Sequence, residues 1–155
     1  MPAIKILVGT VYGGARDVAD HIQPMLEAKG FTVEVSEEPS IADLENKELD
    51  AILISCSTTG AGDFPPNFDK FYHTLHEQGA ALSHLKYGII SLGDSSYDET
   101  FCDAGKKMDA VLAEYGGQRV GRPLEVDAAE HFDATEPAGD WIGRWADQLL
   151  QAEIA

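Results

Sequence analysis

Residues 4–15 read Ile4-Lys5-Ile6-Leu7-Val8-Gly9-Thr10-Val11-Tyr12-Gly13-Gly14-Ala15. The first five are aliphatic apart from one lysine, which is typical of a strand, and the glycines that follow predict a loop. From Ala15 to Lys29 apolar residues recur at the spacing of one helix face, and Gly30 comes next. These residues therefore indicate a strand, a loop and a helix in succession.

Further strand patterns follow along the chain. Residues 51–56 and 88–92 are nearly all apolar, as expected of strands that are covered on both faces. Residues 31–35 alternate between apolar and polar, which favours a half-buried or edge strand. The last strand falls at either Arg119-Val120 or Leu124-Glu125-Val126.

Helix patterns lie between the strand patterns. Apolar residues recur at helical spacing after Pro65-Pro66, from Phe101 to Tyr115, and from Pro137 to Ala152, where we expect Trp141 and Trp145 to cover the sheet. Because parallel neighbours need crossover connections, this alternation predicts an α/β fold with a single doubly wound parallel sheet of five strands.

Length and composition fit one domain over residues 1–155. Of these residues 44% are hydrophobic, which is enough for a buried core, and no apolar run approaches the ~20 residues of a membrane span. The N-terminus runs into a strand pattern without a cleavage site, so a cytoplasmic location is expected. Two cysteines, Cys56 and Cys102, give no support for a metal site.

The charge of the chain narrows the choice of partners. Eleven Lys and Arg against 27 Asp and Glu give a formal net charge of −16 at pH 7. Solubility alone explains this charge equally well, but such a surface also repels nucleic-acid phosphates and anionic membranes and is attracted to basic protein surfaces. We therefore expect protein partners with basic faces, and neither nucleic acid nor membrane.

The loop from Thr10 to Ala15 has features of a phosphate site. It offers backbone N–H groups, a hydroxyl group and the positive end of a helix dipole. It lacks the lysine of a nucleotide P-loop and the glycine spacing of a dinucleotide fingerprint, which disfavours ATP and NAD. A plain glycine-rich turn explains this loop equally well when it is taken alone.

Two further loops follow strands of the predicted sheet. Residues 57–63 contain Gly60 and Gly62, where a flat ring could approach the main chain, and residues 93–102 present Tyr97, which could stack on a planar ligand. Ligands of such sheets bind outside the carboxyl ends of the strands. Three loops converging at one edge therefore predict a ligand site there.

On these loops the chain resembles the flavodoxin family, and most closely its short-chain, MioC-type members, over nearly its whole length. The resemblance implies a flavodoxin-like fold with strand order 2-1-3-4-5. It implies FMN as the cofactor, with the phosphate at the first loop and the ring between the other two. It implies no catalytic residue and no metal.

The resemblance extends to the individual site residues. Val11 and Ala15 depart from the hydroxyl residues usual in the family, and Thr59 stands where many relatives carry an aromatic residue, so stacking by Tyr97 on one face of the ring is expected. The residues expected to bind FMN are Thr10, Val11, Tyr12, Gly13, Gly14 and Ala15 in the first loop, Ser57, Thr58, Thr59, Gly60, Ala61, Gly62 and Asp63 in the second, and Gly93, Asp94, Tyr97, Phe101 and Cys102 in the third.

The same resemblance implies a low-potential one-electron carrier between a flavin reductase and recipient oxidoreductases, acting as a monomer and not as an enzyme. Two other functions fit the fold, an FMN-dependent NAD(P)H quinone reductase and a flavin-free regulatory or binding module. A low-molecular-weight phosphatase would use Cys56 as nucleophile, but no arginine occurs in residues 57–63.

Overall fold

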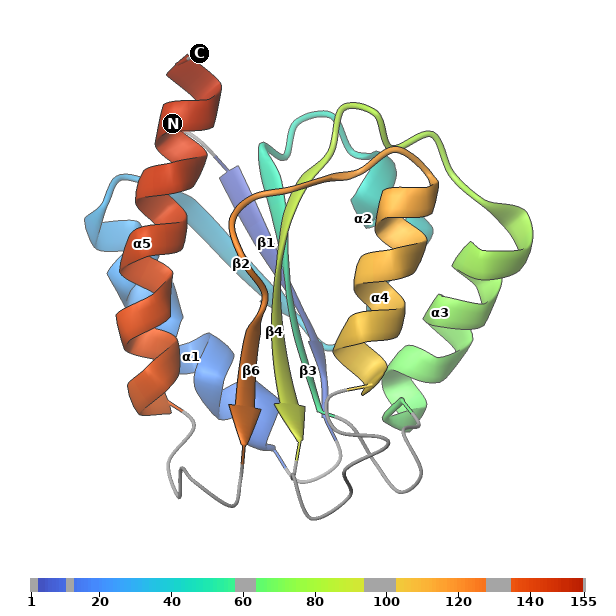
Figure 1. The fold of residues 1–155 in the computed structure, drawn as a ribbon, viewed down its shortest axis with the longest axis horizontal. Coiled ribbons are helices and arrows are strands. Elements are labelled where there is room, and N and C mark those ends of the chain that lie inside the picture. The colour runs from blue at the N-terminus through green and yellow to red at the C-terminus, as the bar shows by residue number, and fades with distance from the viewer. Residues whose placement is uncertain (1–2, 11–12, 58–63, 94–102, 128–134, 155) are drawn as a thin grey trace.

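Strands and helices alternate along the chain, as the sequence predicts (Figure 1). The structure is a computed structural model that describes residues 3–10, 13–57, 64–93, 103–127 and 135–154. In chain order the elements are β1 (Ala3–Gly9), α1 (Gly14–Ala28), β2 (Thr32–Ser36), α2 (Ile41–Glu45), β3 (Ala51–Ser57), α3 (Pro66–Gln78), β4 (Lys86–Gly93), α4 (Asp103–Glu114), β5 (Gln118–Arg119), β6 (Leu124–Asp127) and α5 (Thr135–Ile154).

One parallel sheet organises these strands in the order β2-β1-β3-β4-β5, which confirms the expected order. The sheet has six strands and not the expected five, because two short strands, β5 and β6, share the edge beside β4. β5 pairs with β4 at Lys86 and Tyr87, whereas β6 pairs with the later residues Ile90–Gly93. Both stretches that the sequence left open as the last strand are thus part of the edge.

The break in this edge has a local cause. Gly121 has a φ of 70°, a left-handed conformation that turns the chain out of an extended path. Pro123 follows, and proline has no backbone N–H to donate to a strand ladder. Pairing therefore stops after Val120, whose N–H donates to the carbonyl of Tyr87 at 2.8 Å, and resumes at Leu124.

Helices cover both faces of the sheet, with α1 and α5 on one face and α2, α3 and α4 on the other (Figure 1). Two apolar cores result, one built around Ile6 and Trp145 and the other around Leu7 and Phe68. Residues 51–56 of β3 are buried throughout, which confirms the prediction from their unbroken apolar run. Among the described residues, no helix combines the length and the apolar character needed to span a bilayer.

The short helix α2 was not predicted from the sequence. Its signal is a capping box, in which Ser40 accepts from the Asp43 N–H and Asp43 accepts from the Ser40 N–H. With five residues and a single buried apolar side chain, Leu44, the helix is too short for a periodic pattern. Lys5 on β1 donates to Asp43 at 2.7 Å, which raises the pKa of Lys5 and ties the helix to the sheet.

Close packing of α5 on the sheet gives the first testable prediction. A Cβ added at Gly88 on β4 would lie 2.3 Å from Nε1 of Trp145, so Gly88→Ala forces the indole to shift. We expect this variant to lower the free energy of unfolding by about 1–3 kcal/mol. Urea denaturation followed by circular dichroism measures the change.

The matched control is Gly143→Ala within α5, where an added Cβ meets no atom of the described residues within 4 Å. Because alanine favours a helix interior, this control should raise the free energy of unfolding by about 0.5–1 kcal/mol. Equal effects of the two substitutions would contradict the tight contact between α5 and β4.

Candidate functional site

The strands that precede the three predicted loops end side by side. Gly9 of β1 lies in register with Cys56 of β3, and Cys56 in turn with Ser91 of β4. The carboxyl ends of β1, β3 and β4 therefore meet at one edge of the sheet, which is the lower edge in Figure 1. This is the place where a doubly wound sheet binds its ligands.

The structure describes part of the predicted site. Described are Thr10, Gly13, Gly14, Ala15, Ser57 and Gly93. Outside the described residues lie Val11, Tyr12, Thr58, Thr59, Gly60, Ala61, Gly62, Asp63, Asp94, Tyr97, Phe101 and Cys102. The geometry of the site can therefore be described at the first loop, and the ring-binding part of the site stays a prediction.

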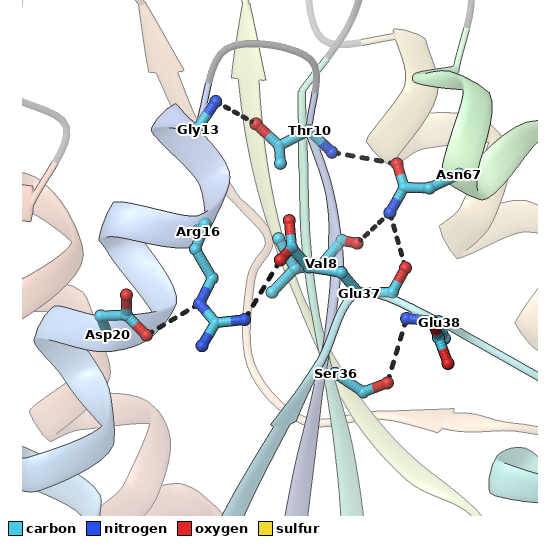
Figure 2. A network of polar contacts seen from close by, with 9 residues as sticks. All are labelled: Val8, Thr10, Gly13, Arg16, Asp20, Ser36, Glu37, Glu38 and Asn67. Carbon is cyan, nitrogen blue, oxygen red and sulfur yellow. Dashed lines mark hydrogen bonds and ion pairs between the residues drawn. The ribbon is translucent and has the colours of Figure 1, made fainter.

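The start of helix α1 has several features of an anion-binding site. Gly13 precedes the helix in a left-handed conformation with a φ of 89°, and its N–H donates to Oγ1 of Thr10 at 2.8 Å (Figure 2). No side chain caps the helix, and the N–H groups of Gly14, Ala15 and Arg16 have no acceptor in the described part of the chain. Three backbone donors and the positive end of the helix dipole thus meet beside Thr10.

These groups fit the phosphate of FMN. Among the described residues Oγ1 of Thr10 accepts from Gly13 and donates to no acceptor, so its hydroxyl hydrogen can donate to a phosphate oxygen. The N–H groups of Gly14, Ala15 and Arg16 supply further donors of the kind that bind phosphate in other proteins. Hydroxyl and backbone donors together fit this anion without a cationic side chain.

Arg16 carries a positive charge in the first turn of α1, and its guanidinium forms ion pairs with two carboxylates. Its Nε contacts Asp20 at 3.0 Å and its Nη1 contacts Glu37 at 3.3 Å, with a half-exposed side chain (Figure 2). The guanidinium charge is therefore balanced by two negative charges. We infer that anion binding at this loop depends on the backbone and on Thr10.

A buried serine fixes the first turn of α1 on the sheet. Oγ of Ser55, which is fully buried on β3, donates to the carbonyl oxygen of Ala15 at 2.9 Å. Buried hydroxyl groups need such a partner, so this bond holds the helix start at the carboxyl end of β3. Ser55 is not among the predicted site residues, although it is the one hydroxyl residue within the otherwise apolar run of residues 51–56.

Asn67, in the first turn of α3, is a second residue that sequence reasoning missed. Its Nδ2 donates to the carbonyl oxygens of Val8 at 2.7 Å and Glu37 at 2.9 Å, and its Oδ1 accepts from the N–H of Thr10 at 3.3 Å. Figure 2 shows this amide between the end of β1 and the segment that follows β2. No spacing or motif marks Asn67 in the sequence.

Cys56 is unsuited to nucleophilic chemistry. Its side chain is fully buried at the end of β3, and burial raises the pKa of the thiol well above its usual range. The thiol therefore stays protonated, which disfavours the phosphatase interpretation. Among the described residues, no group of three or more His, Cys, Asp or Glu side chains is placed to hold a metal ion.

Comparisons with known proteins agree with this geometry. The family described as Flavodoxin matches residues 6–141. Flavodoxin YqcA of Pectobacterium carotovorum subsp. carotovorum is 40% identical over 153 residues, which cover 99% of this chain and 100% of that protein. Protein MioC of Escherichia coli K12 is 38% identical over 149 residues, which cover 96% and 99%.

A solved structure is similar as well. A flavodoxin from Pseudomonas aeruginosa, solved as a cysteine-to-alanine mutant, superposes with a TM-score of 0.86 at 35% sequence identity. The superposition covers 95% of this chain and 98% of that chain. The doubly wound sheet and its helices are therefore those of the matched family.

Proposed function

The chain belongs to the flavodoxin family, whose cofactor is FMN, and we propose that it works as a low-potential one-electron carrier in a single FMN-binding domain over residues 1–155. The observation that carries this proposal is the start of α1, where the Thr10 hydroxyl lies at the carboxyl end of β1 beside three N–H groups that have no acceptor among the described residues. When bound, FMN supplies the redox chemistry, and the protein supplies binding, orientation and electrostatics.

The first loop binds the phosphate in this proposal. Thr10 donates its hydroxyl hydrogen, and Gly14, Ala15 and Arg16 donate backbone N–H groups. Val11, Tyr12 and Gly13 belong to the same proposed binding loop. Thr10 is held in place by Gly13 and Asn67, whose contacts support this role. A phosphate bound here would interact with aligned backbone dipoles at the helix start.

The second and third loops hold the ring in this proposal. Ser57 and Gly93 lie at the ends of β3 and β4, which supports a ring site between the two loops. Tyr97 stacks on one face of the ring, and Thr59 with the main chain covers the other. The proposed ring contacts are Ser57, Thr58, Thr59, Gly60, Ala61, Gly62, Asp63, Gly93, Asp94, Tyr97, Phe101 and Cys102.

Charge sets the direction in which the protein shifts the redox potential. The formal net charge is −16, and the proposed ring site carries the carboxylates of Asp63 and Asp94. Negative charge gained by the cofactor is repelled by these groups, so the last electron is added at low potential. The same surface docks against basic faces of a reductase and a recipient, and we expect electron transfer to slow as salt screens the attraction.

The test starts with titration of the purified protein with FMN, followed by absorption and fluorescence. We expect tight binding, and then two separated one-electron steps when the complex is reduced stepwise without oxygen. A protein that leaves the spectrum of added FMN unchanged would instead be the flavin-free module. Rapid oxidation of NAD(P)H by the FMN complex alone, without a reductase, would favour the quinone reductase.

A further inference from the structure

Asn67 links α3 to the main chain on both sides of Gly9. Its amide accepts from the N–H of Thr10 and donates to the carbonyl oxygen of Val8. Thr10 in turn accepts from Gly13, the residue that precedes α1. A continuous path of hydrogen bonds therefore runs from α3 to the helix start at the proposed phosphate site (Figure 2).

The orientation of this amide is fixed by its partners. Val8 and Glu37 present carbonyl oxygens, which only accept, while Thr10 presents a backbone N–H, which only donates. A flipped amide would break all three contacts. Because Nδ2 uses both of its hydrogens and Oδ1 holds Thr10, the side chain fits this place in one way.

Gly9 allows α3 to come close enough for these contacts. A Cβ added at Gly9 would lie 2.7 Å from the ring of Phe68, the neighbour of Asn67 in the first turn of α3. A larger residue at position 9 would force the ring of Phe68 on α3 to shift. The end of the strand and the first turn of the helix are therefore packed together at the place where Asn67 acts.

From this geometry we infer that Asn67 is a positioning residue for phosphate binding, which holds Thr10 and the start of the first loop in the conformation that receives the phosphate of FMN. Asn67 contacts the loop main chain and does not itself bind the ligand. A loop held in its binding conformation loses less entropy when the ligand binds, so the benefit appears as affinity for the phosphate group. The inference rests on the proposed function, because it deepens the same site.

The experiment compares FMN with riboflavin, which lacks the phosphate. The variant Asn67→Leu keeps a side chain of similar size and removes all three polar contacts, and Asn67→Ala removes them without adding bulk. We expect each variant to weaken FMN binding by about tenfold, the effect of losing roughly one net hydrogen bond, while riboflavin affinity changes by less than about twofold. Fluorescence titration gives both dissociation constants.

The matched control is Asn46→Leu, which also removes an asparagine that accepts from the main chain, in this case from the Glu48 N–H after α2. It should leave both affinities unchanged. Equal weakening of FMN and riboflavin by the Asn67 variants, or no weakening of either, would overturn the inference while the proposed function stands. Failure of the unaltered protein to bind FMN would overturn the proposed function and this inference together.

Discussion

Gly14→Asp is expected to remove most of the affinity for FMN while it stabilises the FMN-free protein. Gly14 is the first residue of α1, and among the described residues an added Cβ there would meet only Leu92, at 3.6 Å, which is an ordinary contact. A carboxylate at this end of the helix interacts favourably with the dipole, by about 0.3–1 kcal/mol. Placed beside the phosphate, however, it repels a second negative charge by about 4 kcal/mol, which weakens FMN binding by about 100- to 1,000-fold.

The control for this prediction is Gly14→Asn, which has nearly the same shape and no charge. Titration of all three proteins with FMN and riboflavin separates charge from shape, and urea denaturation without ligand measures the stability of the helix start. Equal losses in the aspartate and asparagine variants would point to a steric effect. Undiminished FMN affinity in Gly14→Asp would place the phosphate elsewhere and contradict the proposed site.

The strands that the sequence predicts well are those buried on both faces. Residues 51–56 and 88–92 read as continuous apolar runs because helices cover each side of the sheet, and the structure places β3 and β4 there. The divided edge strand carries no such pattern. β5 pairs over two exposed residues, so local sequence could not decide between its stretch and that of β6.

The sequence likewise identifies some residues of the candidate site and not others. Thr10 and Gly13 could be named from residue type, since a hydroxyl and a glycine before a helix are local features of a phosphate loop. Asn67 could not be named from the sequence, because its contacts depend on how closely α3 approaches β1. That close approach is possible because Gly9 has no side chain. Tertiary packing of this kind leaves no periodic signal in one sequence.

Trp145→Ala is expected to produce the largest loss of stability in this chain. Trp145 is buried on α5 with a relative exposure of 1%, lies against Gly88 of β4, and stacks on Trp141 with ring centroids 5.9 Å apart. Removing so large a side chain leaves a cavity between the helix and the sheet, and we expect the free energy of unfolding to fall by about 3–5 kcal/mol. Denaturation of the FMN-free protein measures this loss, since bound FMN adds stability by mass action.

A pair of phenylalanine variants separates packing from hydrogen bonding. Nε1 of Trp141 donates to the carbonyl oxygen of Arg122 at 3.0 Å, whereas Nε1 of Trp145 is buried without a partner among the described residues. Trp141→Phe therefore loses a hydrogen bond of about 1 kcal/mol in addition to ring volume, whereas Trp145→Phe loses ring volume without losing a hydrogen bond. Because Trp145→Phe also removes an unpaired buried N–H, it should cost much less than Trp145→Ala. Similar losses for Trp145→Phe and Trp145→Ala would show that this contact depends on the indole N–H and would contradict the packing account.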